Sequence, residues 1–179
     1  FLLRFHMPFF LSIFLGAFLA SFIALFFGFV LSRFRDDYYL LATLAFNGIV
    51  FSFLLNAQEI TRGALGIGGI PKPSFFGILF LSSYLFFLLA LCVLFLSYLV
   101  IRFIVESSFG RVLRAIREDE NAIQVFGYRT SRYKLFAFVV AAFFAGLAGG
   151  LYATYITFIE PSSFLIAESV FMLTIIILG

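Results

Sequence analysis

Few residues in this chain could carry out chemistry, and they do not cluster as an enzyme site would require. The 179 residues include one histidine, His6, and one cysteine, Cys92. His6 has no nearby cluster of metal ligands, and Cys92 has no second cysteine with which to form a disulfide or a thiolate metal site. We therefore expect no catalytic residue, no bound metal and no cofactor.

Most of the charge lies in one stretch, residues 102–134, which holds seven of the chain's twelve lysines and arginines. The remainder is strongly apolar: 64% of all residues are hydrophobic and 12% are charged, about half the charged share of a soluble domain. A soluble fold of this size would leave more surface than so few polar residues could cover. Lipid is therefore expected to surround most of the chain.

The apolar residues are arranged in runs of membrane-spanning length. A helix needs about 20 mainly apolar residues to cross the hydrocarbon core, and four runs meet this length while a fifth begins: 9–31, 38–57, 78–101, 135–153 and 164–179. Glycine and proline interrupt residues 58–77 and predict a structured loop. We expect an all-α, polytopic transmembrane helix bundle, a single domain over residues 1–179 that is truncated at both ends.

The positions of lysine and arginine predict the orientation of this bundle. Loops rich in these residues remain in the cytoplasm, which places residues 102–134 inside. Alternation then places residues 33–37 inside as well, and the loops 58–77 and 154–163 outside. Arg62 and Lys72 are the only basic residues of the two outer loops, so charge and alternation agree.

Small residues recur on two of the expected helices and predict where helices could approach closely. Such stripes allow close backbone contact in membranes, although they also occur in generic packing. One stripe runs along the first helix and two adjacent stripes run along the fourth: Gly16, Ala20, Ala24 and Gly28, then Ala142, Gly146 and Gly150 beside Ala141, Ala145 and Gly149.

The charged stretch contains a predicted amphipathic helix over residues 111–126, bounded by Gly110 and Gly127. Its apolar face would hold Val112, Ile116, Ile123 and Phe126. Such a helix could lie on lipid, dock on a soluble partner or cap the bundle. The opposite face has charges of both signs, which favours docking in a protein groove over lipid, but a plain solvated loop remains the alternative.

Several segments together resemble a known family, the permease subunits of branched-chain amino acid ABC importers and in particular the LivM-like type. The first is the charged stretch around residues 110–127. The others are residues 132–135 running into AFFAGLAGGLYA at 142–153, RDDYYLLATLAF at 35–46, and TRGALGIGGIP at 61–71. In that family the charged stretch engages the ATPase subunits. The resemblance implies that the coupling residues are Gly110, Arg111, Arg114, Ala115, Arg117, Glu118, Asp119, Glu120 and Gly127.

The resemblance also implies the partners and the cellular location. A permease of this type pairs with a second homologous membrane subunit, two ABC ATPase subunits and an extracytoplasmic substrate-binding protein, in a bacterial-type plasma membrane. It would hydrolyse nothing itself. The cargo would be branched-chain or related amino acids, with urea and small amides left open, and nucleic acid is not an expected partner.

Three polar residues within apolar runs are candidates for the translocation path: Thr43, Asn47 and Glu168. Thr43 and Asn47 could equally form an interhelical hydrogen bond. Glu168 could meet an ammonium group, line a polar cavity or pair with a basic residue elsewhere. An ion-coupled secondary transporter or a channel subunit remains the alternative function, although either should have several intramembrane charges.

Overall fold

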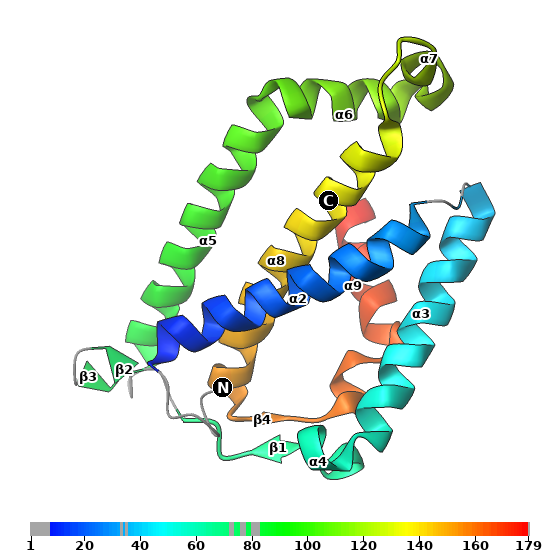
Figure 1. The fold of residues 1–179 in the computed structure, drawn as a ribbon. Coiled ribbons are helices and arrows are strands. Elements are labelled where there is room, and N and C mark those ends of the chain that lie inside the picture. Colours follow the sequence, from blue (N-terminus) through cyan, green and yellow to red (C-terminus); the bar gives the residue numbers. More distant parts are fainter. Residues whose placement is uncertain are drawn as a thin grey trace.

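Two long helices, α2 (Phe9–Leu31) and α8 (Thr130–Ile156), cross one another in the computed structural model of this protein (Figure 1). The structure describes residues 8–178 apart from 33, 35, 72–73, 76–77 and 80–82. His6, Arg33, Arg35 and Lys72 therefore lie outside the described residues. The other long helices are α3 (Asp36–Asn56), α5 (Ser83–Glu106) and α9 (Ile166–Leu178).

Short elements connect these helices at both ends. Around the glycine-rich loop they are α4 (Gln58–Thr61), the 3₁₀-helix η1 (Gly63–Leu65), and the strands β1 (Ile67–Gly68), β2 (Ser74–Phe75) and β3 (Ile78–Leu79). The charged stretch contains α6 (Ser108–Glu118) and α7 (Glu120–Val125), and the last connection contains β4 (Phe158–Ile159) and the 3₁₀-helix η2 (Pro161–Phe164).

The expected all-α transmembrane bundle is confirmed. Among the described residues, α2, α5 and α8 are each long and apolar enough to cross a membrane. The second predicted span corresponds to helix α3, in which Leu41–Asn56 is an apolar stretch. The fifth, α9, contains the shorter apolar stretch Ala167–Leu178.

The third predicted span, residues 78–101, is wrong at both ends. Ile78 and Leu79 form strand β3, which pairs with β2 in a small hairpin, and helix α5 is observed from Ser83. The helix then continues to Glu106, and Arg102 Nε and Glu106 Oε1 lie 2.8 Å apart on one exposed face of its last turn. Arg102, predicted to lie in a loop, is therefore helical.

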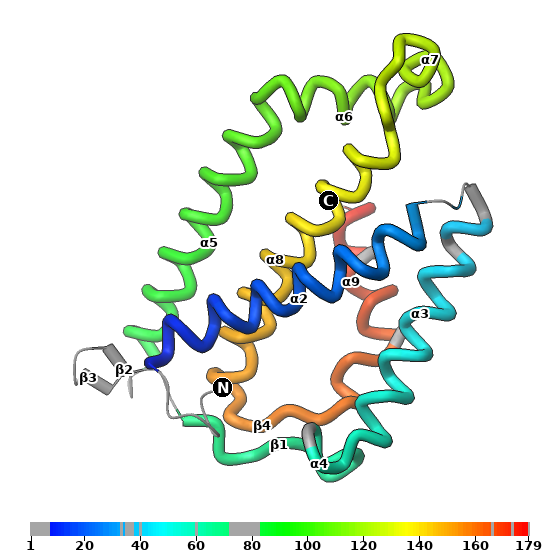
Figure 2. The backbone as a smooth tube through the Cα atoms, in the orientation of Figure 1, coloured from blue at the N-terminus to red at the C-terminus, as the bar shows by residue number. Residues whose placement is uncertain are grey.

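The two predicted outer loops meet in a short antiparallel ladder. Ile67 pairs with Ile159 and Gly68 with Phe158, which joins β1 to β4. Gly66 precedes the ladder with a φ of +68°, and a Cβ there would lie 2.5 Å from the carbonyl oxygen of Ile159. Figure 2 shows this ladder at the opposite end of the long helices from the α6–α7 segment. The predicted alternation of the loops is therefore consistent with the fold.

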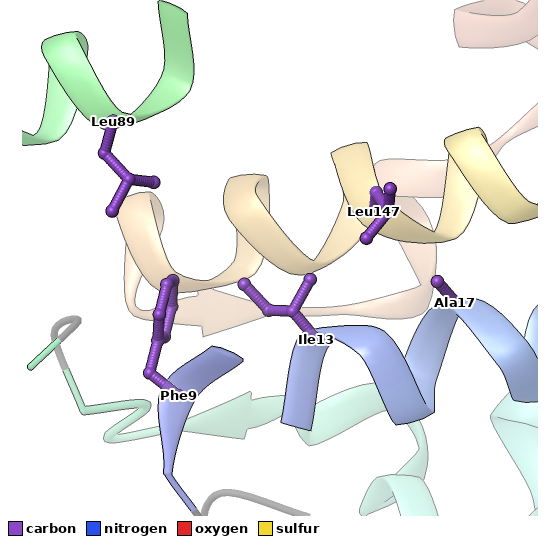
Figure 3. Packing of buried hydrophobic residues seen from close by; sticks show 5 residues of the cluster. All are labelled: Phe9, Ile13, Ala17, Leu89 and Leu147. Atoms are coloured by element: carbon purple, nitrogen blue, oxygen red, sulfur yellow. The ribbon is translucent and has the colours of Figure 1, made fainter. Parts of the chain in front are cut away.

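Close contact between α2 and α8 forms the centre of the bundle. Ala17 on α2 is completely buried, and a Cβ added at Gly146 on α8 would lie 2.8 Å from the Ala17 Cα atom. Figure 3 shows Phe9, Ile13 and Ala17 beside Leu147 of α8, with Leu89 of α5 at one edge. The predicted close approach of two helices is therefore observed at Gly146, where α8 contacts α2.

The other predicted small residues differ in their surroundings. Gly28 lies against Leu135 and Phe138 of α8, and Gly150 lies against Ile13. Cβ atoms added at Gly16 or Gly149 would meet nothing within 4 Å. The second row on α8, which includes Gly149 and the exposed Ala141 and Ala145, therefore takes no part in the α2 contact.

Replacing Gly146 with alanine is expected to destabilise the bundle by about 1–3 kcal/mol, because the new methyl group would push α2 away from α8. Gly149→Ala is the matched control on the same helix, where alanine should favour the helix by up to about 1 kcal/mol. Unfolding of the full-length protein in detergent checks both changes. Equal stabilisation by the two substitutions would contradict the observed contact.

Candidate functional site

The chain turns sharply between α5 and α6, and Gly110 permits this turn. Ser107 caps α6 by accepting a hydrogen bond from the Gly110 amide at 3.4 Å. Gly110 lies inside α6, where an added Cβ would collide with the Val105 carbonyl group. The prediction that Gly110 bounds the helix is therefore wrong: the helix begins earlier, at Ser108, and glycine is needed for close approach to α5.

The predicted single helix over residues 111–126 is also wrong, because Asp119 divides it into α6 and α7. The Asp119 backbone is extended, with φ −152° and ψ 102°. Its Oδ1 atom accepts hydrogen bonds from the amides of Asn121 at 2.9 Å and Ala122 at 3.0 Å. An aspartate cap of this kind favours a new helix start over continuation. We call α6 and α7 together, residues 108–125, the elbow.

The apolar face of the elbow matches the prediction in α6 and in part of α7. Ile116 is buried and Val112 and Ile123 are partly buried. Phe126, predicted to lie on the same face, is instead 77% exposed because the chain leaves α7 at this point and turns through Gly127 with a φ of +85°. Gly127 thus ends the helix as predicted.

Two of the predicted coupling arginines support the elbow itself. Arg111 donates hydrogen bonds to Ser108 Oγ at 2.7 Å and to the Glu106 carbonyl oxygen at 3.4 Å. Arg114 donates to the Val105 carbonyl oxygen at 3.5 Å. These bonds partly satisfy the carbonyl groups left open at the end of α5.

The next residues along α6 are exposed. Among the described residues, no hydrogen bond or ion pair engages the side chain of Arg117 or Glu118. Ala115, which follows Arg114 in the sequence, is partly buried. Arg117 and Glu118 are therefore the predicted coupling residues whose charges remain available for another molecule.

Glu120 is occupied inside the chain. Its Oε1 atom accepts hydrogen bonds from Thr130 Oγ1 at 2.9 Å and Gln124 Nε2 at 3.4 Å, and its Oε2 atom forms an ion pair with Lys134 Nζ. Gln124 also donates to Thr130 Oγ1 at 2.9 Å. Thr130 is 2% exposed at the start of α8, so this network fixes α7 to α8.

Sequence reasoning missed the partners in this network. The sequence pattern places Lys134 among the charges of the loop and in the segment 132–135 that resembles the family, and it does not single out Thr130 or Gln124. The separation between Glu120 and Lys134 is 14 residues, which no helical spacing would indicate. The sequence offers one indirect indication of this network. Thr130 and Lys134 lie in the first turns of a membrane-spanning helix, where polar side chains need partners.

The Glu120–Lys134 pair lines a hollow of about 540 Å³ at the same end of the bundle. Leu113 of α6, Leu31 and Ser32 at the end of α2, and Tyr39 of α3 also line it. The elbow therefore lies next to the connection between α2 and α3 as well as to α8.

The candidate path residues lie on two different helices. Thr43 and Asn47 are partly buried, one turn apart on α3, whose Phe46 packs against Phe27 of α2 with ring centres 3.8 Å apart. The Asn47 amide has no hydrogen-bond partner among the described residues. Glu168 is exposed in the first turn of α9, where the positive end of the helix dipole favours a carboxylate.

Comparison with known proteins connects these features to a transport family. The family model for the permease component of branched-chain amino acid transport systems matches residues 1–179. The high-affinity branched-chain amino acid transport system permease proteins LivM of Salmonella typhimurium and Escherichia coli are each 39% identical over 175 residues, covering 85% of this chain and 41% of the relative.

A more distant relative agrees. The probable branched-chain amino acid transport permease protein LivM of Methanocaldococcus jannaschii is 28% identical over 136 residues, covering 74% of this chain and 38% of the relative. No solved structure matches. The chain spans about two fifths of the length of these curated relatives. It is a multi-pass membrane protein, and it belongs to the family of permease components of branched-chain amino acid transport systems.

Proposed function

We propose that this chain is part of the membrane-spanning permease subunit of an ATP-driven importer for branched-chain or related amino acids. Family membership and the names of the relatives support this function over an ion-coupled transporter or a channel. The permease forms the translocation path, and ATP is hydrolysed by separate subunits.

The proposed complex contains two ABC ATPase subunits, a second homologous permease subunit and an extracytoplasmic substrate-binding protein. Residues 102–134, with seven of the twelve basic residues, would face the cytoplasm and the ATPases. The β1–β4 ladder would then face outward, close to the entry for the substrate.

The exposed surface of the elbow is the observation that carries the coupling role. Val125 and Phe126 are 86% and 77% exposed at the end of α7, next to a loop whose charges would keep it out of the lipid. Arg117 and Glu118 are exposed and without described partners on α6. A segment that exposes both apolar side chains and free charges is suited to a groove on a protein partner. The groove would bury the apolar side chains, and the charges would fix the orientation of the complex.

The Glu120 network supports transmission of motion from this surface into the membrane. A partner that moves the elbow would also move the start of α8, since Glu120 joins α7 to Thr130 and Lys134. α8 is continuous from Thr130 to Ile156 and packs along α2. Closure of the ATPase dimer would therefore rock α8 and α2 between outward-facing and inward-facing arrangements.

Thr43, Asn47 and Glu168 remain our candidates for the path. The amide of Asn47, partly buried and without a described partner, favours a role facing water or substrate over a hydrogen bond to a neighbouring described helix. Glu168 at the start of α9 could attract the ammonium group of an amino acid.

Exchanging Arg117 and Glu118 together for alanine is expected to weaken assembly with the ATPase subunits by about tenfold or more. The matched control is Arg102→Ala with Glu106→Ala, which also removes one charge of each sign at the same end and leaves the net charge unchanged. Co-purification of the full-length complex and its substrate-stimulated ATPase rate measure the effect. If the Arg117 and Glu118 variant co-purifies with the ATPase subunits and stimulates ATP hydrolysis as the wild type does, the proposed docking role is wrong.

Glu120→Gln is expected to loosen α7 from α8 by roughly 1–2 kcal/mol, because the Lys134 ammonium loses its charged partner in a partly buried position. Faster amide hydrogen exchange over residues 120–130 of the full-length protein would report this change. Glu118→Gln, two residues earlier at the end of α6 and without a described partner, should leave the exchange rates as they are. If both variants exchange like the wild type, Glu120 does not hold the elbow.

A further inference from the structure

A second hollow, of about 550 Å³, lies beside the start of α8 and is not used by the proposed coupling role. Aromatic side chains and two arginines line it: Phe109, Tyr128, Tyr133 and Phe136 with Arg129 and Arg132. It is separate from the Glu120–Lys134 hollow, which is lined by other residues of α8.

The aromatic side chains form a continuous apolar wall. The Phe109 ring stacks on Tyr133 with centres 5.3 Å apart and meets Phe136 edge-on at 4.9 Å. Tyr128 meets Tyr133 edge-on at 6.2 Å. Tyrosines are enriched at the boundary between hydrocarbon and headgroups, where the ring is in an apolar layer and the hydroxyl in a polar one.

The two arginines supply positive charge that the described part of the chain does not neutralise. Arg129 and Arg132 are exposed, and neither guanidinium group has a hydrogen bond or ion pair with a described residue. Lys134 and Arg102 differ, since they pair with Glu120 and Glu106. No acidic residue is among the described lining residues or in the first turn of α8, so the hollow is suited to an anion.

The spacing along α8 orders these groups from polar to apolar. Arg132, Tyr133 and Phe136 lie on one side of α8, because Phe136 follows the first two by one helical turn, and Arg129 precedes the helix as its N-cap residue. The same steps continue to Val140 and Phe143, which line an apolar groove of about 780 Å³ together with residues of α2 and α5. From Thr130 to Phe143 the helix rises about 20 Å, slightly more than one leaflet of the hydrocarbon core.

We propose that this face of α8 binds an anionic phospholipid. Its phosphate group lies between Arg129 and Arg132, whose guanidinium groups match phosphate oxygens in geometry and charge. The glycerol region lies against Tyr128 and Tyr133, and one acyl chain follows Phe136 into the groove at Val140 and Phe143. A protein partner would cover the arginines equally well, but it would have no reason to require the apolar groove that continues into the membrane.

The test uses the full-length permease, purified and stripped of lipid, with native mass spectrometry as the readout. Dioleoyl-phosphatidylglycerol and dioleoyl-phosphatidylcholine are titrated separately, and inorganic phosphate is added as a competitor. We expect tighter binding of phosphatidylglycerol, weakened about fivefold by Arg132→Gln and about twentyfold by Arg129→Gln with Arg132→Gln. Arg102→Gln removes one exposed charge at the same end and should leave the preference unchanged.

A conservative pair keeps the result interpretable if the glutamine variant folds poorly. Arg129→Lys with Arg132→Lys retains the charge and should retain the preference for phosphatidylglycerol. Equal binding of the two lipids by the wild type would overturn the proposal. So would displacement of phosphatidylglycerol by an equal concentration of inorganic phosphate, which indicates a plain anion site, or by added ATPase subunits, which indicates a protein interface.

Discussion

The position of the elbow depends on the hydrogen bonds and the ion pair of the Glu120 carboxylate, and so does its proposed coupling role. This carboxylate receives hydrogen bonds from Thr130 and Gln124 and pairs with Lys134, so the elbow has a fixed position relative to α8. Without it, α7 would be a short helix whose ends are an aspartate cap and a glycine turn, with little apolar burial of its own. Six residues of isolated helix are not stable in water.

Contacts continue from this network to the far end of the bundle. α8 is one uninterrupted helix that packs on α2, where Gly146 meets Ala17, and it leads into β4, which pairs with β1. The elbow at one end and the glycine-rich loop at the other are therefore joined by a single helix and its close packing. A rigid element of this kind can carry a movement across a membrane without any change in its own conformation.

Much of this fold follows from the sequence, because lipid imposes simple requirements on length and polarity. The apolar runs predicted the five long helices, and the alternation of these runs predicted which loops share an end. Short-range contacts lie where the observed helix ends differ from the predicted ones: Asp119 caps the new helix α7, and Arg102 pairs with Glu106 on the last turn of α5. Both signals are short-range and visible in the sequence. The pairing of β1 with β4 joins Ile67 to Ile159 and Gly68 to Phe158, which are 92 and 90 residues apart in the sequence, and no local pattern indicates it.

The candidate site was only partly predictable for the same reason. Arg117 and Glu118 are exposed, as their positions on the predicted helix indicated. Glu120 was predicted to belong to the same group, but it contacts Thr130 and Lys134, which are distant in the sequence. Family resemblance suggested the coupling role that we propose for the segment, and the described contacts divide its residues into those that build the elbow and those that remain free. Arg111, Arg114, Asp119 and Glu120 belong to the first group.

The most direct test of this account is a pair of distances between spin labels in the full-length importer complex, with and without ATP. Cysteines replace Asn121 on α7 and Ser131 on α8 in one sample, and Asn121 and Tyr38 on α3 in the other, with Cys92 replaced by serine in both. The account predicts that the Asn121–Ser131 distance stays constant while the Asn121–Tyr38 distance changes on ATP binding. A change of similar size in the Asn121–Ser131 distance would contradict it, because the elbow would then move independently of α8.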